Sequence, residues 1–246
     1  MRRPHICGAR CRPVSAWQGP DQAAYVSRAF ARIARRYDLM NHLMTVGRDQ
    51  AWRQFAVRQL ACAPGSRVLD VGTGTGDFLP LLARRGCTAI GVDFALPMMR
   101  VGRAKLGSHG EQAAFVAGDA LRLPFRDGSV EGVINGFLLR NVADLHGTLA
   151  EMRRVVKPGG RVVCLEITWP SLPLFRQAFA LYFGRLVPLI GGLVTGQPDV
   201  YTYLPRSVAA FASPDRLVEV MRDAGWREAR YRRLALGTVS VHTGVK

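Results

Sequence analysis

The chain has 246 residues, enough for one α/β domain with a large core and too few for two domains of ordinary size. A hydrophobic content of 48% and a charged content of 21% exclude an intrinsically disordered chain. The formal net charge is +16, with three lysines and 31 arginines against 18 acidic residues. A basic surface of this kind suits either nucleic acid or an anionic membrane, and because the sequence has no nucleic-acid-binding motif we expect a membrane surface as partner and no nucleic acid.

The cysteines predict free thiols rather than a disulfide framework. They are odd in number and widely separated: Cys7, Cys11, Cys62, Cys87 and Cys164. This pattern favours a reducing compartment. No group of histidines and cysteines has the spacing of a convincing metal site, so we expect no metal ion.

Residues 1–21 are predicted to form a basic, disordered tail, and residues 22–246 a single folded domain. The first 20 residues contain four arginines and no acidic residue. They lack the apolar segment of a secretory signal, whereas an organelle transit peptide stays open because such peptides are basic and acid-free. We expect a cytoplasmic protein at the inner face of the membrane, with mitochondrial targeting left open.

Residues 22–60 predict helices ahead of the first strand. Asp21 is suited to cap a helix over residues 23–36, whose apolar side chains recur on one face. A further helix is predicted over residues 49–60. These helices are additions to the α/β core, in a position to lie over its cofactor cleft.

Residues 67–83 form the motif on which the rest of the chain depends. Arg67–Val71 reads as a buried strand, the sequence Gly72-Thr73-Gly74-Thr75-Gly76 as a turn, and residues 76–85 as the first crossover helix. Glycine allows a ligand to lie against the backbone, and the free amides at the helix start attract a carboxylate or phosphate. Strand, glycine-rich turn and helix are typical of a nucleotide-binding unit.

A second strand, Thr88–Asp93, ends in the acid Asp93. A carboxylate in this position accepts hydrogen bonds from ribose hydroxyls, which both NAD and S-adenosylmethionine carry. The G-x-G-x-G spacing after Leu69-Asp70 favours S-adenosylmethionine, whereas a dinucleotide site would have G-x-G-x-x-G. A Rossmann oxidoreductase is the alternative from another enzyme class.

The remaining core alternates strands and helices, which predicts a mostly parallel sheet. Residues 158–160, Pro-Gly-Gly, are predicted to stop the helix before them. The predicted elements are a helix over 96–105, strands over 114–117 and 129–135, a helix over 144–156, and a strand over 161–167.

The segment 172–195 is the most apolar of the chain. Arg176, Arg185 and Pro188 argue against a membrane span, so we expect an interfacial or substrate-covering insertion over residues 172–212, with an ordinary buried helix as the alternative. Ser213 then caps a helix, and two final strands over 226–234 and 237–244 are predicted to form a hairpin at the sheet edge.

Several motifs together resemble the ubiquinone/menaquinone biosynthesis C-methyltransferases over residues 22–246. Two positions depart from the family pattern: Leu138 stands where the family usually has glycine, and Gly72 where it usually has alanine. If that glycine makes room beside the substrate, Leu138 narrows the pocket. The motifs are Tyr37-Asp38-Leu39-Met40-Asn41, Leu139-Arg140-Asn141-Val142, Tyr203-Leu204-Pro205-Arg206-Ser207-Val208 and His242-Thr243-Gly244-Val245-Lys246.

The resemblance implies a Rossmann-like class I methyltransferase with a mostly parallel seven-stranded sheet and S-adenosylmethionine as cofactor. It implies that Asp119 and Ala120 lie at the adenine, where a carboxylate accepts from the exocyclic amine. A homodimer stays open. The cofactor-binding residues implied are Asp70, Gly72, Thr73, Gly74, Gly76, Asp93, Asp119 and Ala120.

The expected reaction is methylation of a ring carbon of a polyprenylated quinol. Loss of a hydroxyl proton makes the neighbouring carbon nucleophilic, so a site that stabilises the phenolate accelerates transfer. We assign Arg140 to phenolate stabilisation or water positioning and Asn141 to orienting the ring hydroxyl or the cofactor. His242 is a candidate base with a structural role equally open. Tyr203 and Ser207 are expected to line the quinol pocket.

The sequence leaves the acceptor open between two quinols. Conversion of demethylmenaquinol to menaquinol is slightly favoured, and methylation of 2-methoxy-6-polyprenyl-1,4-benzoquinol, as in ubiquinone biosynthesis, is the alternative. A non-catalytic scaffold of a quinone-synthesis complex is a more distant alternative. The apolar insertion and the N-terminal helices are natural walls for a prenyl tail.

Overall fold

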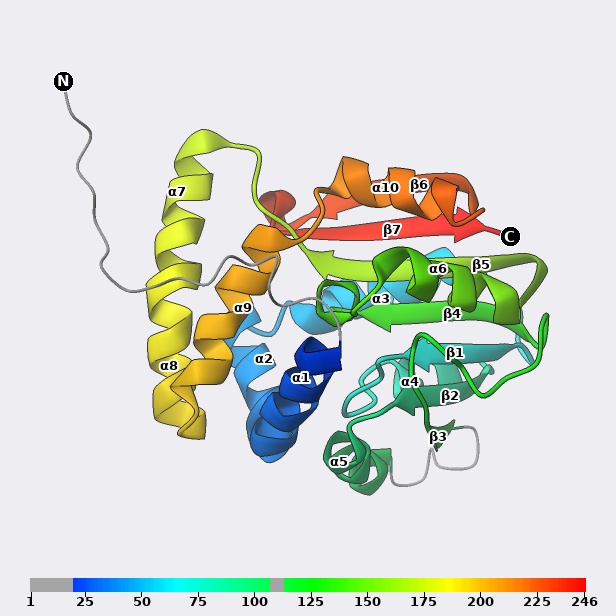
Figure 1. The fold of residues 1–246 in the computed structure, drawn as a ribbon, viewed down its shortest axis with the longest axis horizontal. Coiled ribbons are helices and arrows are strands. Elements are labelled where there is room, and N and C mark those ends of the chain that lie inside the picture. Colours follow the sequence, from blue (N-terminus) through cyan, green and yellow to red (C-terminus); the bar gives the residue numbers. More distant parts are fainter. Residues whose placement is uncertain (1–19, 107–112) are drawn as a thin grey trace.

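The computed structural model describes residues 20–106 and 113–246. Its centre is a seven-stranded sheet in the order β3-β2-β1-β4-β5-β7-β6, which confirms the predicted architecture (Figure 1). The first five strands in chain order are parallel, and the β6–β7 hairpin is antiparallel to β5 at one edge. The strands are β1 (Arg67–Val71), β2 (Thr88–Asp93), β3 (Ala113–Ala117), β4 (Val130–Gly136), β5 (Val156–Ile167), β6 (Arg227–Leu234) and β7 (Val239–Val245).

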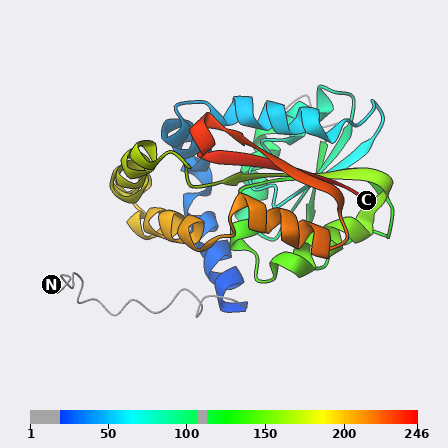
Figure 2. The same ribbon diagram turned by 90° about the horizontal axis from the view of Figure 1, so that it is seen from above.

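Helices cover both faces of the sheet (Figure 2). Apolar side chains of α3 (Asp49–Leu60) and α4 (Leu79–Ala83) pack on one face. Those of α6 (Leu145–Val155) and α10 (Pro214–Asp223) pack on the other. Helix α5 (Leu96–Leu106) lies next to β3.

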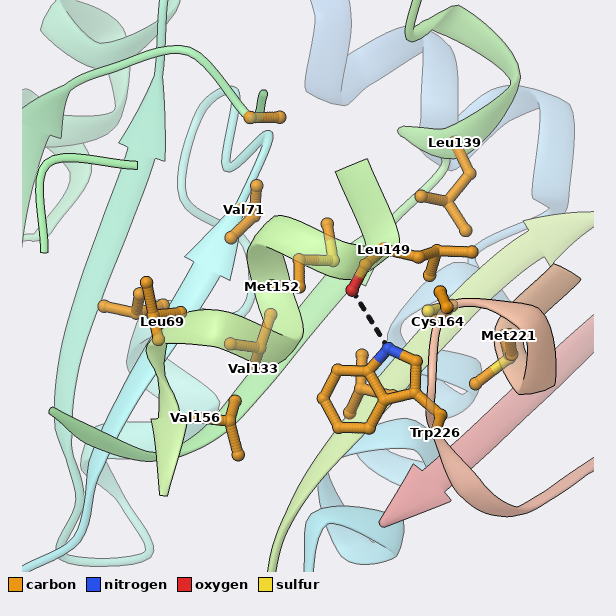
Figure 3. Packing of buried hydrophobic residues seen from close by; sticks show 14 of the residues in the cluster. Leu69, Val71, Val133, Leu139, Leu149, Met152, Val156, Cys164, Met221 and Trp226 are labelled. Atoms are coloured by element: carbon orange, nitrogen blue, oxygen red, sulfur yellow. Dashed lines mark hydrogen bonds between the residues drawn. The ribbon is translucent and has the colours of Figure 1, made fainter. Parts of the chain in front are cut away.

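Trp226 ties the terminal hairpin to the core on the α6 side (Figure 3). The indole is buried, and its Nε1 donates a hydrogen bond to the carbonyl of Leu149 over 3.0 Å. A buried tryptophan keeps its N–H satisfied in this way while its ring fills apolar space.

A third group of helices lies beyond the carboxyl ends of the parallel strands (Figure 1). It has its own small core, to which Met40, Phe183, Val187 and Tyr201 belong. The helices come from both halves of the chain: α1 (Pro20–Ile33), α2 (Tyr37–Thr45), α7 (Pro173–Leu181), the π-helical turn η5 (Tyr182–Leu186), α8 (Val187–Thr195) and α9 (Pro198–Ala210).

Several predicted boundaries differ from the structure. The first helix begins at Pro20, so Asp21 lies inside it, and α4 is much shorter than residues 76–85 because the glycine turn continues to its start. The helix before Pro158-Gly159-Gly160 ends ahead of them as predicted, but the three residues belong to β5, which was predicted to begin only at Arg161. Helix α6 ends at Val155, and β5 begins at the next residue. The pairing of β5 with β4 shifts register at residues 157–160, and the amide of Gly159 donates a hydrogen bond to the Lys246 carbonyl.

Candidate active site

Two cavities meet at the carboxyl edge of the sheet. The first, the cofactor cavity, is lined by residues that follow β1, β2, β3 and β4, including Gly72, Gly74, Asp93, Asp119 and Ala120. The second, the acceptor cavity, is walled mainly by α1, α2, α3, α7, η5 and α9. Four residues border both cavities, namely Val26, Phe30, Tyr37 and Phe137.

Asp93 joins the glycine turn to the loop before α5. Its carboxylate accepts from the amides of Gly74 and Ala95, each over 2.8 Å. Burial raises the pKa of Asp93, while the backbone hydrogen bonds oppose that rise. Each carboxylate oxygen retains a lone pair for a further donor, so Asp93 can still accept from a ribose hydroxyl.

Asp70, Thr73 and Gly76 are not among the residues that line the cofactor cavity. Asp70 is buried, and its Oδ2 accepts from the Thr73 hydroxyl over 2.6 Å. Burial raises the pKa of Asp70 to about 7, against the Thr73 bond that lowers it. The structure therefore makes these residues supports of the turn rather than contacts of the cavity.

Leu138 and Gly72, the two departures from the family pattern, pack against each other. Gly72 has a φ of +69°, and a Cβ atom built on it would lie 2.6 Å from Cδ1 of Leu138. Leu138 lines the cofactor cavity and is not among the residues that line the acceptor cavity. Leu138 therefore does not narrow the acceptor cavity, because its side chain fills the space above Gly72.

The acceptor cavity is mostly apolar and aromatic. Its wall includes Phe30, Trp52, Phe137, Ile167, Phe179, Tyr182 and Phe183. Polar side chains also line it, namely Tyr37, Asn41, Thr45, Asp49, Arg140, Tyr201, Tyr203 and Thr238. A large apolar cavity with a few polar groups is the usual form of a site for a small organic molecule.

Arg140 reaches the acceptor cavity from the short turn η4 (Leu139–Asn141), which follows β4. Its Nη1 donates to the Phe137 carbonyl over 2.7 Å and pairs with Glu166 over 3.3 Å. Burial raises the pKa of Glu166 to about 7, although Arg140 and the Leu139 amide oppose that rise. Nε of Arg140 is buried without a partner among the described residues, which leaves a donor for a ligand.

Asn141 connects the two cavities. It lines the cofactor cavity, its Nδ2 donates to the Phe137 carbonyl over 3.2 Å, and its Oδ1 accepts from the hydroxyl of Tyr203 over 3.1 Å. Tyr203 lines the acceptor cavity, as predicted from the sequence. Ser207 lines neither cavity, and its hydroxyl donates instead to the Leu204 carbonyl, so the structure does not bring it to the site.

Phe137 is a site residue that the sequence analysis missed. Its φ of +60° is a strained value for a phenylalanine, and its amide donates to Leu165 O over 2.7 Å. The guanidinium carbons of Arg53 and Arg140 lie 5.5 Å and 5.9 Å from its ring centroid. Its place directly after a strand was the available signal, but nothing in the sequence indicates the strained backbone.

His242 does not reach either cavity. It is fully buried on β7, where Nε2 donates to the Pro214 carbonyl over 3.2 Å and the ring packs beside Tyr231. Burial lowers the pKa of His242 to about 4, against the bond to Pro214. The prediction of His242 as a base is contradicted by this position.

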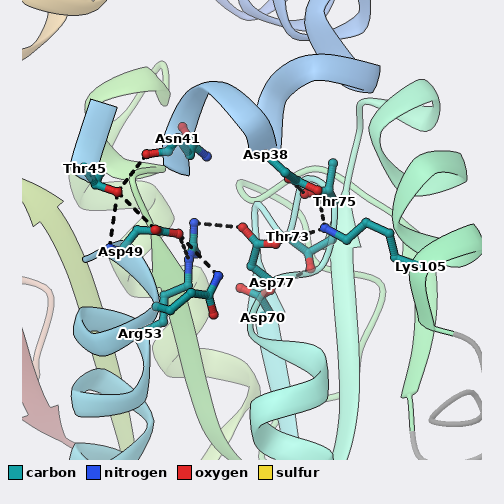
Figure 4. Close-up of polar contacts among 11 residues, drawn as sticks. Asp38, Asn41, Thr45, Asp49, Arg53, Asp70, Thr73, Thr75, Asp77 and Lys105 are labelled. Carbon is teal, nitrogen blue, oxygen red and sulfur yellow. Dashed lines mark hydrogen bonds and ion pairs between the residues drawn. The ribbon is translucent and has the colours of Figure 1, made fainter. Parts of the chain in front are cut away.

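A polar network links the N-terminal helices to the glycine turn (Figure 4). Thr75 donates to Asp38 over 2.6 Å, and Lys105 pairs with both Asp38 and Asp77. Arg53, buried on α3, pairs with Asp77 over 3.0 Å. The network fixes α2 and α3 against the turn that lines the cofactor cavity.

Known proteins match this chain over nearly its whole length. A family model described as the ubiE/COQ5 methyltransferase family matches residues 19–246. Proteins named demethylmenaquinone methyltransferase from Roseiflexus castenholzii and Deinococcus radiodurans are 49% and 44% identical, over 92% and 95% of this chain and 96% and 97% of theirs.

Solved structures agree on the fold. A SAM-dependent methyltransferase from Thermotoga maritima superposes with a TM-score of 0.64 at 20% identity, over 89% of this chain and 99% of that one. This similarity concerns architecture, whereas the family model and the two relatives match the sequence itself. The chain is therefore a methyltransferase and belongs to the ubiE/COQ5 methyltransferase family.

Proposed function

We propose that the protein methylates a ring carbon of demethylmenaquinol with S-adenosylmethionine, which gives menaquinol. The observation that carries this proposal is an aromatic acceptor cavity, with Arg140 in its wall, that shares four residues with the cofactor cavity. The names of the two relatives support the choice of acceptor. In the overall reaction the ring carbon gains a methyl group and loses its hydrogen as a proton.

The cofactor cavity suits S-adenosylmethionine. A Cβ on Gly74 would approach only Met98, at 3.5 Å, so the glycine keeps the cavity open beside the turn. Asp93 would hold the ribose hydroxyls, and Asp119, beside Ala120, would accept from the adenine amine. When bound, the cofactor supplies a methyl group activated by a sulfonium. The protein's part is then to align the acceptor carbon and to stabilise its charge.

Arg140 would stabilise the quinol oxygen as negative charge develops on it. Glu166 and the Phe137 carbonyl hold one end of the guanidinium, which leaves Nε for the ligand. A fixed cation in a cavity with little water stabilises an oxyanion far more than the same cation in bulk water. Asn141, tied to Tyr203, would orient the acceptor ring at the border of the two cavities.

The helix pair α7–α8 is the proposed path of the prenyl tail and the membrane-docking face. Residues 173–195 form the one described helical segment long and apolar enough to cross a membrane, by length and composition only. Phe179, Tyr182 and Phe183 of this segment line the acceptor cavity. Five leucines of the same segment are exposed: Leu174, Leu181, Leu186, Leu189 and Leu193.

The exposed leucines share one face of this helix pair because of η5. Two turns of an α-helix contain about seven residues. Leu181 and Leu189 are eight residues apart, and the π-helical turn between them contains the additional residue, so the two side chains lie on the same face. Arg176 and Arg185 lie on the same segment and are exposed. Leucines flanked by arginines, on a protein of net charge +16, support docking on an anionic bilayer surface rather than insertion across it.

A methyl-transfer assay tests the proposed reaction. Purified protein and labelled S-adenosylmethionine are given demethylmenaquinol and the demethylated benzoquinol in separate reactions under reducing conditions. Label in the naphthoquinol product alone supports the proposal, and label in both products indicates an enzyme of both pathways. Label in the benzoquinol product alone would show that the acceptor is the benzoquinol and not demethylmenaquinol. Label in neither product, with cofactor bound, would favour a non-catalytic scaffold of a quinone-synthesis complex.

A further inference from the structure

Asp49 is the acidic side chain in the wall of the acceptor cavity. Among the described residues lining that cavity no other carries a carboxylate, and Asp49 is only 3% exposed. It is the first residue of α3 and faces α2 (Figure 4). Burying a carboxylate in an apolar cavity is costly, so its presence there calls for a role.

The hydrogen bonds of Asp49 do not saturate its carboxylate oxygens. Its Oδ1 lies 3.1 Å from the Thr45 hydroxyl, but that hydroxyl has a single proton and lies closer, at 2.7 Å, to the Asn41 carbonyl. Oδ2 accepts from Gln50 over 3.3 Å. Both contacts come from neutral groups and are longer than the bonds that charged partners form.

Arg53 forms only a long ion pair with Asp49. Its Nε lies 3.7 Å from Asp49 Oδ2, whereas its Nη2 lies 3.0 Å from Asp77. Nε of Arg53 has no hydrogen-bond partner among the described residues. The guanidinium therefore pairs mainly with the carboxylate beside the glycine turn.

Buried polar atoms accompany Asp49 in the same cavity wall. Nε of Arg140 is buried without a hydrogen-bond partner in the described part of the chain, and Nδ2 of Asn41 and the hydroxyl of Tyr201 are also buried there. A buried donor such as Nε of Arg140 is normally satisfied, and here a ligand with hydroxyl or phenolate oxygens would satisfy it. The cavity thus offers donors for ring oxygens together with one carboxylate.

We propose that Asp49 is the catalytic base that takes the hydroxyl proton of the acceptor. This inference rests on the proposed quinol methylation. The quinol O–H bond breaks, an O–H bond forms on Asp49, and the electron pair stays on the ring oxygen, from which it makes the adjacent carbon nucleophilic. After the new C–C bond forms, the ring carbon loses its hydrogen to water as a proton. Asp49 returns its proton to the product oxygen, so one proton is released overall.

Other acids and bases of the site are less suited to this step. His242 lies outside both cavities, and its pKa is lowered by burial. Glu166 does not line the acceptor cavity, and its two carboxylate oxygens are bonded to the Leu139 amide and to Arg140. Arg140 is a cation without acceptor atoms, and it can stabilise the oxyanion that Asp49 creates.

Kinetics of Asp49→Asn give the first test. The change keeps the size and most hydrogen bonds but removes the basic oxygen, so we expect kcat to fall about 10²- to 10⁴-fold with unchanged affinity for S-adenosylhomocysteine. Asp49→Glu should restore part of kcat. The matched control is Asp199→Asn, since Asp199 pairs with Arg32 on the surface and lines neither cavity. A kcat of Asp49→Asn within about twofold of the wild type would overturn the proposal.

The second test needs no turnover. A naphthol absorbs at different wavelengths as the neutral molecule and as the anion, so its spectrum reports whether the bound hydroxyl is ionised. We expect the wild type and Asp199→Asn to shift bound naphthol toward the anion, and Asp49→Asn to lose that shift. If Asp49→Asn does not fold, Asp49→Ser takes its place. An anion signal that survives removal of the carboxylate would overturn the proposal.

The two tests separate this inference from the proposed function. If the wild-type protein ionises naphthol but methylates no quinol, the proposed function is wrong and Asp49 remains the proton acceptor of the cavity. If the wild-type protein methylates demethylmenaquinol, and Asp49→Asn is as active and ionises naphthol to the same extent, only the assignment of Asp49 as the base is wrong.

Discussion

The cofactor cavity and the acceptor cavity differ in how far along the chain their parts lie. The bond that closes the cofactor side, from Gly74 to Asp93, joins residues 19 positions apart. On the acceptor side Tyr203 bonds Asn141 across 62 positions, and Tyr182 bonds the Met44 carbonyl across 138. The glycine turn and carboxylate of the first cavity come from a local strand–turn–helix–strand motif, whereas the second cavity exists only once helices from both ends of the chain pack together.

Arg140→Ala should impair the acceptor side alone, with the largest effect among the Arg140, His242, Gly72 and Leu189 variants. We expect kcat to fall about 10²- to 10³-fold because the oxyanion loses its cation. Calorimetric affinity for S-adenosylhomocysteine should stay near that of the wild type, since Arg140 does not line the cofactor cavity. Equal losses of turnover and cofactor affinity would instead make Arg140 a cofactor-binding residue.

His242→Gln should change stability and leave both cavities intact. The pKa of His242 is about 4 in the folded chain, against 6.5 for an unperturbed histidine, so the unfolded chain binds more protons between these values. The neutral ring therefore makes its full contribution to the free energy of unfolding above pH 6.5. As the pH falls toward 4, the free energy of unfolding decreases by about 3 kcal/mol. Urea unfolding at pH 7.5 and pH 4.5 measures it; the variant should lose less stability on acidification than the wild type. The same pH dependence in both would contradict the assignment.

Gly72→Ala tests the packing of the cofactor side. The added methyl would meet Leu138 in a backbone conformation that disfavours alanine, so we expect a loss of about 1–3 kcal/mol in unfolding free energy, with weaker cofactor binding. The double variant Gly72→Ala/Leu138→Ala should recover part of both. Additive losses in this double-mutant cycle would show that the two positions are independent.

Leu189→Glu tests the proposed membrane face and should affect chemistry least. Loss of one leucine from the bilayer surface should weaken binding to anionic phosphatidylglycerol vesicles about tenfold, while turnover of a short-tailed quinol stays unchanged. Leu236→Glu is the control, because Leu236 is exposed on the short turn η6 (Ala235–Gly237). Unchanged vesicle binding, with a dimer that Leu189→Glu dissociates, would assign the leucine face to a second copy of the chain.

The sequence predicted the cofactor side well because its signals are local. Alternating apolar strands and helices fix a parallel sheet, and glycines at alternate positions with Asp93 at the next strand end fix the turn and its carboxylate. Even there, the direction of a side chain was beyond the sequence. Asp70 lies in a motif typical of cofactor contact, yet it points under the turn to Thr73.

The sequence by itself determined the fold class, the family resemblance and the edge of the sheet at which ligands bind. Only the tertiary structure decided that His242 is buried under α10, that Leu138 fills the space above Gly72, and that Asp49 lines the acceptor cavity. The physical reason is that helical and strand periodicity specify which face of an element is buried. The identity of the groups that meet across that face depends on how distant elements pack.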